Sequence, residues 1–133
     1  MYFADLTPYE FDGGEPSPYV LNVGWLSMQH EFARGPINPE ALNAVRRLSG
    51  CPENLFRGSH LCEFCPPPPV IERNGLRFIE PPEGTAGNGE IRVKGATGKT
   101  YVAPVLVVHY IEAHGYSPPN EFVEAVLSSE RDA

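Results

Sequence analysis

Short segments in which apolar and polar residues alternate recur along the chain, as expected for half-buried strands. Residues 19–25, YVLNVGW, form a first apolar run of strand-forming types. Residues 70–81, VIERNGLRFIEP, contain Asn74-Gly75 at their centre. This dipeptide is the strongest short signal for a hairpin turn. Residues 89–104, GEIRVKGATGKTYVAP, alternate in the same way around a second glycine-containing turn, and we expect a second hairpin there.

A helical period appears in three other segments. From Asn38 to Gly50 the apolar residues recur at helical spacing, and the two end residues suit a helix cap and a helix stop. Residues 103–115, APVLVVHYIEAHG, are apolar on nearly every side, so they predict a buried helix. A last helix is expected within residues 116–129, YSPPNEFVEAVLSS, with Ser117 as its cap.

The order of these elements predicts an α+β fold, because hairpins and helices follow one another without a repeated strand–helix unit. We expect a single small domain over residues 1–133 with two β-hairpins, one early helix, a Cys/His metal knuckle and a C-terminal helix pair. A chain of this length can bury a core of its own. Residues 1–18 are acidic and rich in proline and glycine, so we expect an arm that lies on the domain.

Composition and charge narrow the classes of function. The chain has a net charge of −7 with only 10 lysine and arginine residues, so a nucleic-acid partner is disfavoured. No apolar run reaches membrane-spanning length, and the N-terminus lacks the regions of a signal peptide. We therefore expect a cytoplasmic protein. Its three cysteines, an odd number, favour a metal site in a reducing compartment over a disulfide framework.

The most specific chemical motif is the sequence H-x-C-x-x-C, formed by His60, Cys62 and Cys65. A C-x-x-C turn places two thiolates within reach of one zinc ion, and zinc takes four ligands from cysteine and histidine. His60 lies two residues before the first cysteine and can reach a third position. Two thiolates with imidazole favour zinc over other metals. The sequence thus predicts one structural Zn²⁺ ion.

We predict His109 as the fourth ligand, because a buried imidazole needs a partner and this residue lies in an apolar segment. Cys51, His114 and a water molecule are the alternatives. His109 and His114 are five residues apart, which places them about 140° apart around a regular helix. We therefore expect that both cannot reach the same ion. The predicted metal ligands are His60, Cys62, Cys65 and His109.

The fourth ligand decides the class of function. Four protein ligands make a closed structural site, whereas three ligands and a water molecule permit hydrolysis or deamination. Zinc deaminases carry a glutamate two residues after the histidine ligand, and His60 has none. We favour a non-enzymatic zinc-binding protein without catalytic residues. The alternative is a small zinc-dependent hydrolase or deaminase-like enzyme that uses Glu63 or Glu90.

The chain also resembles a known family. The blocks DLTPYEF, RGSHLCEFC, GNGEIRV, YVAP and HYIEAHGYSPPNEFVEAV follow one another over nearly its whole length. In this order they resemble a family of small uncharacterised bacterial proteins. The positions that match include His60, Cys62, Cys65, the block 87–93 and His109-Tyr110. The resemblance implies a single stand-alone domain and no particular activity.

Size and acidity suggest a task in protein interaction. A surface with a net charge of −7 complements a basic partner protein. We expect an interaction module whose partner has a basic surface. An immunity-type pairing with a secreted nuclease toxin is one example of such a partnership.

Overall fold

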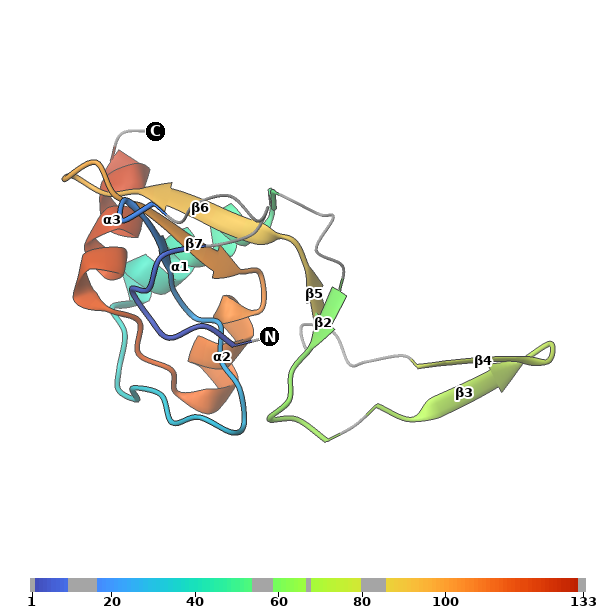
Figure 1. Ribbon diagram of the computed structural model, residues 1–133. Helices are drawn as coiled ribbons and strands as arrows, with labels where there is room; N and C mark the ends of the chain where they lie inside the picture. Colours follow the sequence, from blue (N-terminus) through green and yellow to red (C-terminus); the bar gives the residue numbers. More distant parts are fainter. Residues whose placement is uncertain (1, 10–16, 54–58, 67, 80–85, 132–133) are drawn as a thin grey trace.

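A computed structural model describes residues 2–9, 17–53, 59–66, 68–79 and 86–131. In these ranges the chain forms helices packed against a three-stranded sheet, together with two separate two-stranded ribbons (Figure 1). The predicted α+β fold class is confirmed. The elements, in chain order, are β1 (Val20–Asn22), α1 (Pro39–Ser49), β2 (Ser59–Leu61), β3 (Val70–Arg73), β4 (Leu76–Ile79), β5 (Ala86–Asn88), β6 (Glu90–Lys94), β7 (Thr100–Pro104), α2 (Val107–His114) and α3 (Asn120–Arg131).

The main sheet has the strand order β1-β7-β6. Strands β6 and β7 form the predicted second hairpin, with Ile91 paired to Ala103 in antiparallel register. Strand β1 lies parallel to β7, with Leu21 paired to Tyr101. The first strand is therefore shorter than the apolar run that predicted it, and its partner comes from the last third of the chain.

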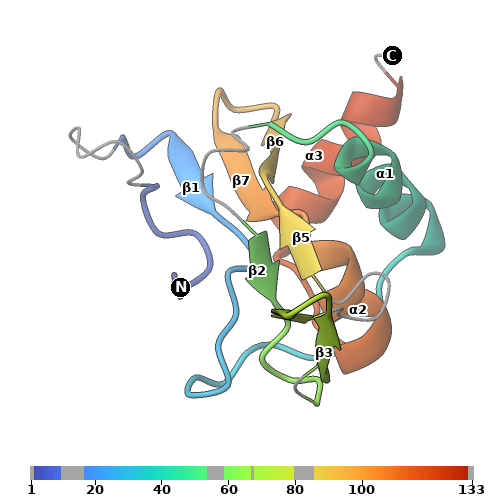
Figure 2. The same ribbon diagram turned by 90° about the vertical axis from the view of Figure 1, so that its right-hand side faces the viewer.

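The helices gather on one side of this sheet (Figure 2). The side chain of Asn38 accepts a hydrogen bond from the backbone N–H of Glu40, and Gly50 ends the helix, so the predicted limits of α1 are confirmed. Val45 on α1 and Phe122 on α3 are fully buried. The helices thus complete a core whose other side chains come from β6, β7 and the segment after β1, including Val23, Ile91, Val93, Val102 and Ala103.

The third helix begins later than predicted. Ser117 was expected as the cap, but α3 begins at Asn120, and the carbonyl of Pro119 accepts the first helical hydrogen bond, from Phe122. The backbone N–H of Ser117 instead donates to the carbonyl of Ala33 at 2.9 Å. A tertiary contact between two loops therefore outweighs the local capping signal.

Helix α2 is also shorter and more amphipathic than its sequence suggested. It covers Val107–His114 and ends at Gly115, which adopts the left-handed conformation with φ 69°. Tyr110 and Ile111 are buried, whereas Glu112 is exposed. One face of α2 packs on the core, and the other reaches the surface.

The first predicted hairpin is confirmed as β3–β4, with its turn at Asn74-Gly75. Both turn residues have positive φ, 53° and 77°, as a tight two-residue hairpin turn requires. The hairpin projects from the rest of the molecule (Figure 1) and leaves apolar side chains in solvent. Leu76 is 69% exposed and Val70 is 64% exposed.

The ribbon of β2 and β5 positions the turn that contains Cys62 and Cys65. His60 in β2 pairs with Gly87 in β5. A side chain at position 87 would lie within 3.4 Å of Val105 and Leu106, directly before α2. The absence of a side chain at Gly87 therefore lets the ribbon pack closely there, which brings the end of β2 alongside α2.

The first residues of the chain pack beside β1. Pro8 bridges Leu21 in antiparallel fashion, and the Tyr9 hydroxyl donates to both carboxylate oxygens of Glu90 at 3.0 and 2.9 Å. Residues 10–16 of the predicted arm lie outside the described residues. Among the helices described here, none combines the length and the apolar character needed to cross a membrane.

Candidate metal centre

Four side chains from two elements converge at one point beside α2. They are Cys62 and Cys65 from the turn after β2, and His109 and His114 from α2. Each offers one ligand atom, and these four atoms all lie within 4.8 Å of one another. Cys62 is buried, and the other three are half-buried. Two cysteines and two histidines in this arrangement could hold a metal ion.

The cysteines are presented by a compact turn of the chain. Strand β2 ends at Leu61, and residues 62–65 turn directly after it. Burial raises the pKa of the Cys62 thiol, while hydrogen bonds from the backbone N–H groups of Phe64 and Cys65 act in the opposite direction. Such backbone donors stabilise a thiolate, which is the form that binds a metal.

The expectation that His109 and His114 cannot reach the same point is wrong. Their Nε2 atoms lie 3.2 Å apart, and their rings are nearly perpendicular, with centroids 4.9 Å apart. Helical side chains lean toward the N-terminus of their helix, so the ring of His114 projects back over the preceding turn. The angle of 140° describes only where the two Cα atoms lie around the helix axis. It does not include the length of the two imidazole side chains.

Four of the six distances between the ligand atoms are close to the edges of a zinc tetrahedron. Zinc–ligand bonds of about 2.0–2.3 Å imply edges of about 3.3 Å between two nitrogens and about 3.6 Å between nitrogen and sulfur. The sulfur of Cys65 lies 3.2 Å from His109 Nε2 and 3.6 Å from His114 Nε2. The sulfur of Cys62 lies 3.4 Å from His114 Nε2. The residues present therefore fit a four-coordinate ion.

The chemistry of the donor set fits the same ion. Two thiolates and two neutral imidazoles are a common ligand set of structural zinc sites. Burial, and then the nearby His114, lower the pKa of His109. A lowered pKa keeps its imidazole neutral at neutral pH, as a metal ligand must be.

An aromatic side chain fixes the turn against the helix. The ring of Phe64, between the two cysteines, packs edge-on against Tyr110 with centroids 5.8 Å apart. It also lies 5.2 Å from the ring of His114 and makes an edge contact with Phe32. Phe64 thus holds the cysteine turn and the histidine helix together through packing alone.

The other sequence candidates occupy different places. The backbone of His60 lies in β2, but its side chain falls outside what the structure describes, so its role as a ligand stays a prediction. Cys51 is exposed and is not among the four clustered residues. Glu90 is fully buried and forms an ion pair with Arg92 at 3.0 Å. Glu63 is exposed and lies in the cysteine turn, directly after Cys62.

A family assignment accompanies this geometry. A family model described as a domain of unknown function, DUF7919, matches residues 1–127. The chain belongs to this family. The match agrees with the resemblance to small uncharacterised proteins, whereas the sequence blocks that carried the resemblance stay predicted motifs. Neither the curated proteins nor the solved structures contain a significant match to the chain.

Proposed function

We propose that this member of the DUF7919 family is a zinc-binding protein in which one ion, held by Cys62, Cys65, His109 and His114, stabilises the fold for a role in protein interaction. The observation that supports the proposal most strongly is the convergence of four ligand atoms within 4.8 Å. Their spacing corresponds to one tetrahedral ion.

A structural role follows from the number of protein ligands. Four protein ligands fill all the positions of a tetrahedral zinc ion and leave none for a water molecule. Hydrolysis or deamination at zinc needs such a water molecule. The proposed ligand set therefore favours a structural ion over the zinc-dependent hydrolase that the sequence left as an alternative.

The ion would cross-link two parts of the chain that also meet through the packing of Phe64 and Gly87. The cysteine turn belongs to the β2–β5 ribbon, whereas the histidines belong to a helix of the main core. Metal–ligand bonds across this junction replace the apolar core that such a ribbon cannot form by itself.

The interaction role is supported by exposed surface of two kinds. The projecting hairpin leaves Val70, Leu76 and Ile79 in solvent, and exposed apolar surface often marks a site of contact. The chain as a whole carries a net charge of −7. We propose a partner protein with a basic surface that meets the acidic body and the apolar hairpin.

The ligand set can be tested by X-ray absorption spectroscopy on zinc-loaded protein, together with elemental analysis. We expect one zinc per chain, with two sulfur neighbours at about 2.3 Å and two nitrogen neighbours at about 2.0 Å. A spectrum with an oxygen ligand at an open position would contradict the structural role and would restore the hydrolase alternative.

The interaction role needs a separate experiment. The variant Leu76→Ser/Ile79→Ser changes only exposed positions of the hairpin, so its zinc content and melting temperature should equal those of the wild type. In affinity capture, basic proteins retained by the wild type should be lost by this variant. Identical capture by both proteins would exclude the hairpin as the contact surface.

A further inference from the structure

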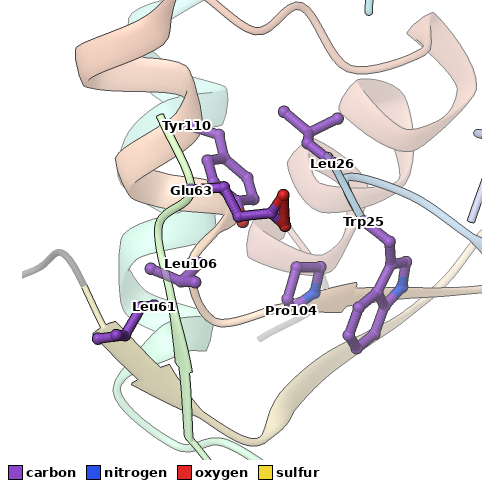
Figure 3. A pocket seen from close by; sticks show the side chains of 7 residues that line it. All are labelled: Trp25, Leu26, Leu61, Glu63, Pro104, Leu106 and Tyr110. Atoms are coloured by element: carbon purple, nitrogen blue, oxygen red, sulfur yellow. The ribbon is translucent and has the colours of Figure 1, made fainter. Parts of the chain in front are cut away.

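A small cavity lies directly beside the candidate metal centre. Its volume is about 70 Å³. Figure 3 shows the side chains that line it. Since a water molecule occupies about 30 Å³ of liquid, this space fits only a few non-hydrogen atoms. Two of its lining residues are chain neighbours of the ligands, because Glu63 follows Cys62 and Tyr110 follows His109. The remaining lining residues are Trp25, Leu26, Leu61, Pro104 and Leu106.

Six of the seven residues that line the cavity are apolar or aromatic, and Glu63 is the exception. The rings of Trp25 and Tyr110 are almost fully buried, with 4% and 5% of their surface exposed. The indole N–H of Trp25 donates to the carbonyl of Val102 at 3.0 Å, which fixes the ring. The faces of tryptophan and tyrosine rings attract cations, most strongly where water is excluded.

One charged side chain, the exposed Glu63, lines this space. The carboxylate of Glu63 points toward the space between Leu26, Pro104 and Trp25 (Figure 3). Its Oε1 atom has weak partners only, Ser27 Oγ at 3.5 Å and the N–H of Met28 at 3.4 Å. Glu63 forms no ion pair with any residue in the described part of the chain.

The metal centre would leave this charge uncompensated. Two thiolates and two neutral imidazoles exactly balance the charge of one divalent ion, so the loaded centre adds no net charge beside the cavity. Glu63 is then the one charged residue among those that line the cavity. A carboxylate beside aromatic rings and leucines is complementary to a cation on an alkyl chain.

We propose that this cavity binds a primary alkylammonium group, supplied either by a lysine side chain of a partner protein or by a free amine. The ammonium would pair with Glu63, and the adjoining methylene groups would contact the two rings and the leucines. Its volume of about 70 Å³ accommodates the tip of a lysine side chain. This inference deepens the proposed function, because it assigns a specific contact to the basic partner.

The single tryptophan of the chain makes the cavity measurable, because its fluorescence reports on this site alone. Zinc-loaded protein is titrated with n-butylammonium and, in parallel, with n-butanol, which has the same chain without the charge. We expect a saturable change of the Trp25 signal with a dissociation constant on the order of 1 mM for the ammonium. Butanol should bind at least about tenfold more weakly. Equal binding of both, or no saturation, would overturn the proposal.

A pair of variants isolates the carboxylate. Glu63→Gln keeps the shape of the side chain and removes its charge, and should weaken ammonium binding at least about tenfold. Glu31→Gln makes the same change of net charge at an exposed position outside the cavity, and should leave binding unchanged. Equal weakening in both variants would show a general charge effect and would contradict the assignment.

Two blocked tripeptides, with lysine or with norleucine at the centre, separate the two sources of the ammonium group. Binding of the lysine peptide, and not of the norleucine peptide, identifies a protein side chain as the ligand. Binding of n-butylammonium alone identifies a free amine. Zinc content is measured in every sample, so a missing fluorescence change with full zinc occupancy overturns this inference while leaving the proposed metal site intact.

Discussion

At the scale of single residues, the metal site is defined by which histidine joins Cys62, Cys65 and His109 as the fourth ligand. His60 lies two residues before Cys62 in the sequence. His114 is distant in the sequence, but its Nε2 atom lies 3.4 Å from the sulfur of Cys62. The proposed tetrahedron is complete without His60. The two histidines therefore give a sharp contrast in a mutational test.

We expect His114→Ala to lose zinc and His60→Ala to keep it. Removing one of four ligands opens the site and weakens zinc binding by several orders of magnitude, whereas a residue outside the set contributes little. Zinc per chain is measured by elemental analysis after dialysis against a weak chelator. Zinc retained by the His114 variant and lost by the His60 variant would support the ligand set predicted from the sequence.

A second residue-scale prediction concerns Tyr116, which is fully buried and donates its hydroxyl to Asp5 Oδ2 at 2.8 Å. Tyr116→Phe leaves this carboxylate oxygen without its donor and should lower the free energy of unfolding by about 1–3 kcal/mol. Tyr19→Phe is the matched control, because that ring is 60% exposed. Urea unfolding followed by circular dichroism measures both, and equal stabilities would contradict the role of the hydrogen bond.

The same residue predicts a dependence on pH. Burial, and then the Asp5 carboxylate, raise the pKa of the Tyr116 phenol above its ordinary value of 10.0. The folded protein therefore holds this proton more tightly than the unfolded chain, so the contribution to stability is complete below pH 10 and is lost as the pH rises further. We expect the free energy of unfolding to fall above about pH 10, and to fall less steeply in Tyr116→Phe. Parallel curves for the two proteins would refute this.

At the scale of elements, Phe64 connects the cysteine turn, to which it belongs, with the histidine helix α2. Its ring contacts Tyr110 and His114 on α2. The hairpin β3–β4, in contrast, has apolar side chains that largely face solvent. A phenylalanine in each element should therefore respond differently to the same substitution.

Phe64→Ala should lower the free energy of unfolding by about 2 kcal/mol, somewhat less than for a fully buried ring, and should weaken zinc binding. Phe78→Ala removes the same ring from the exposed hairpin, where we expect a loss below about 1 kcal/mol. Chemical unfolding and competition for zinc with a chromophoric chelator measure the two effects. Equal losses in both variants would argue against the packing role of Phe64.

The sequence predicted those elements whose caps and turns are formed by neighbouring residues. The caps of α1 at Asn38 and Gly50 and the turn at Asn74-Gly75 involve neighbouring residues, so these elements were predictable. The parallel pairing of β1 with β7 and that of β2 with β5 join segments far apart in the chain, and no short pattern encodes them. Tertiary contacts also decided where α3 begins.

The candidate site shows the same division. The C-x-x-C turn identifies Cys62 and Cys65 by local spacing, and the apolar surroundings of His109 marked it as unusual. His114 was kept only as an alternative to His109, because an angular argument ignored the length of the two side chains. The tilt of side chains along a helix was the signal that could have placed both histidines at one ion.

At the scale of the whole molecule, the proposed ion takes the place of missing core. The chain contains 15 prolines and 13 glycines, and in the described residues two of the three sheets have only two strands. Isolated ribbons of this kind are at best marginally stable in water. In such a fold the free energy of metal binding becomes free energy of folding, so zinc and structure should be lost together.

The most direct test of this claim is the thermal unfolding of one zinc-loaded sample before chelation, after chelation and after zinc is added back. We expect the melting temperature to fall by about 10 °C or more on removal of zinc and to recover on its return, because each kcal/mol of binding energy shifts it by several degrees. Elemental analysis of each sample verifies the zinc content. An unchanged melting curve in a sample shown to have lost its zinc would contradict the central claim that the ion stabilises this fold.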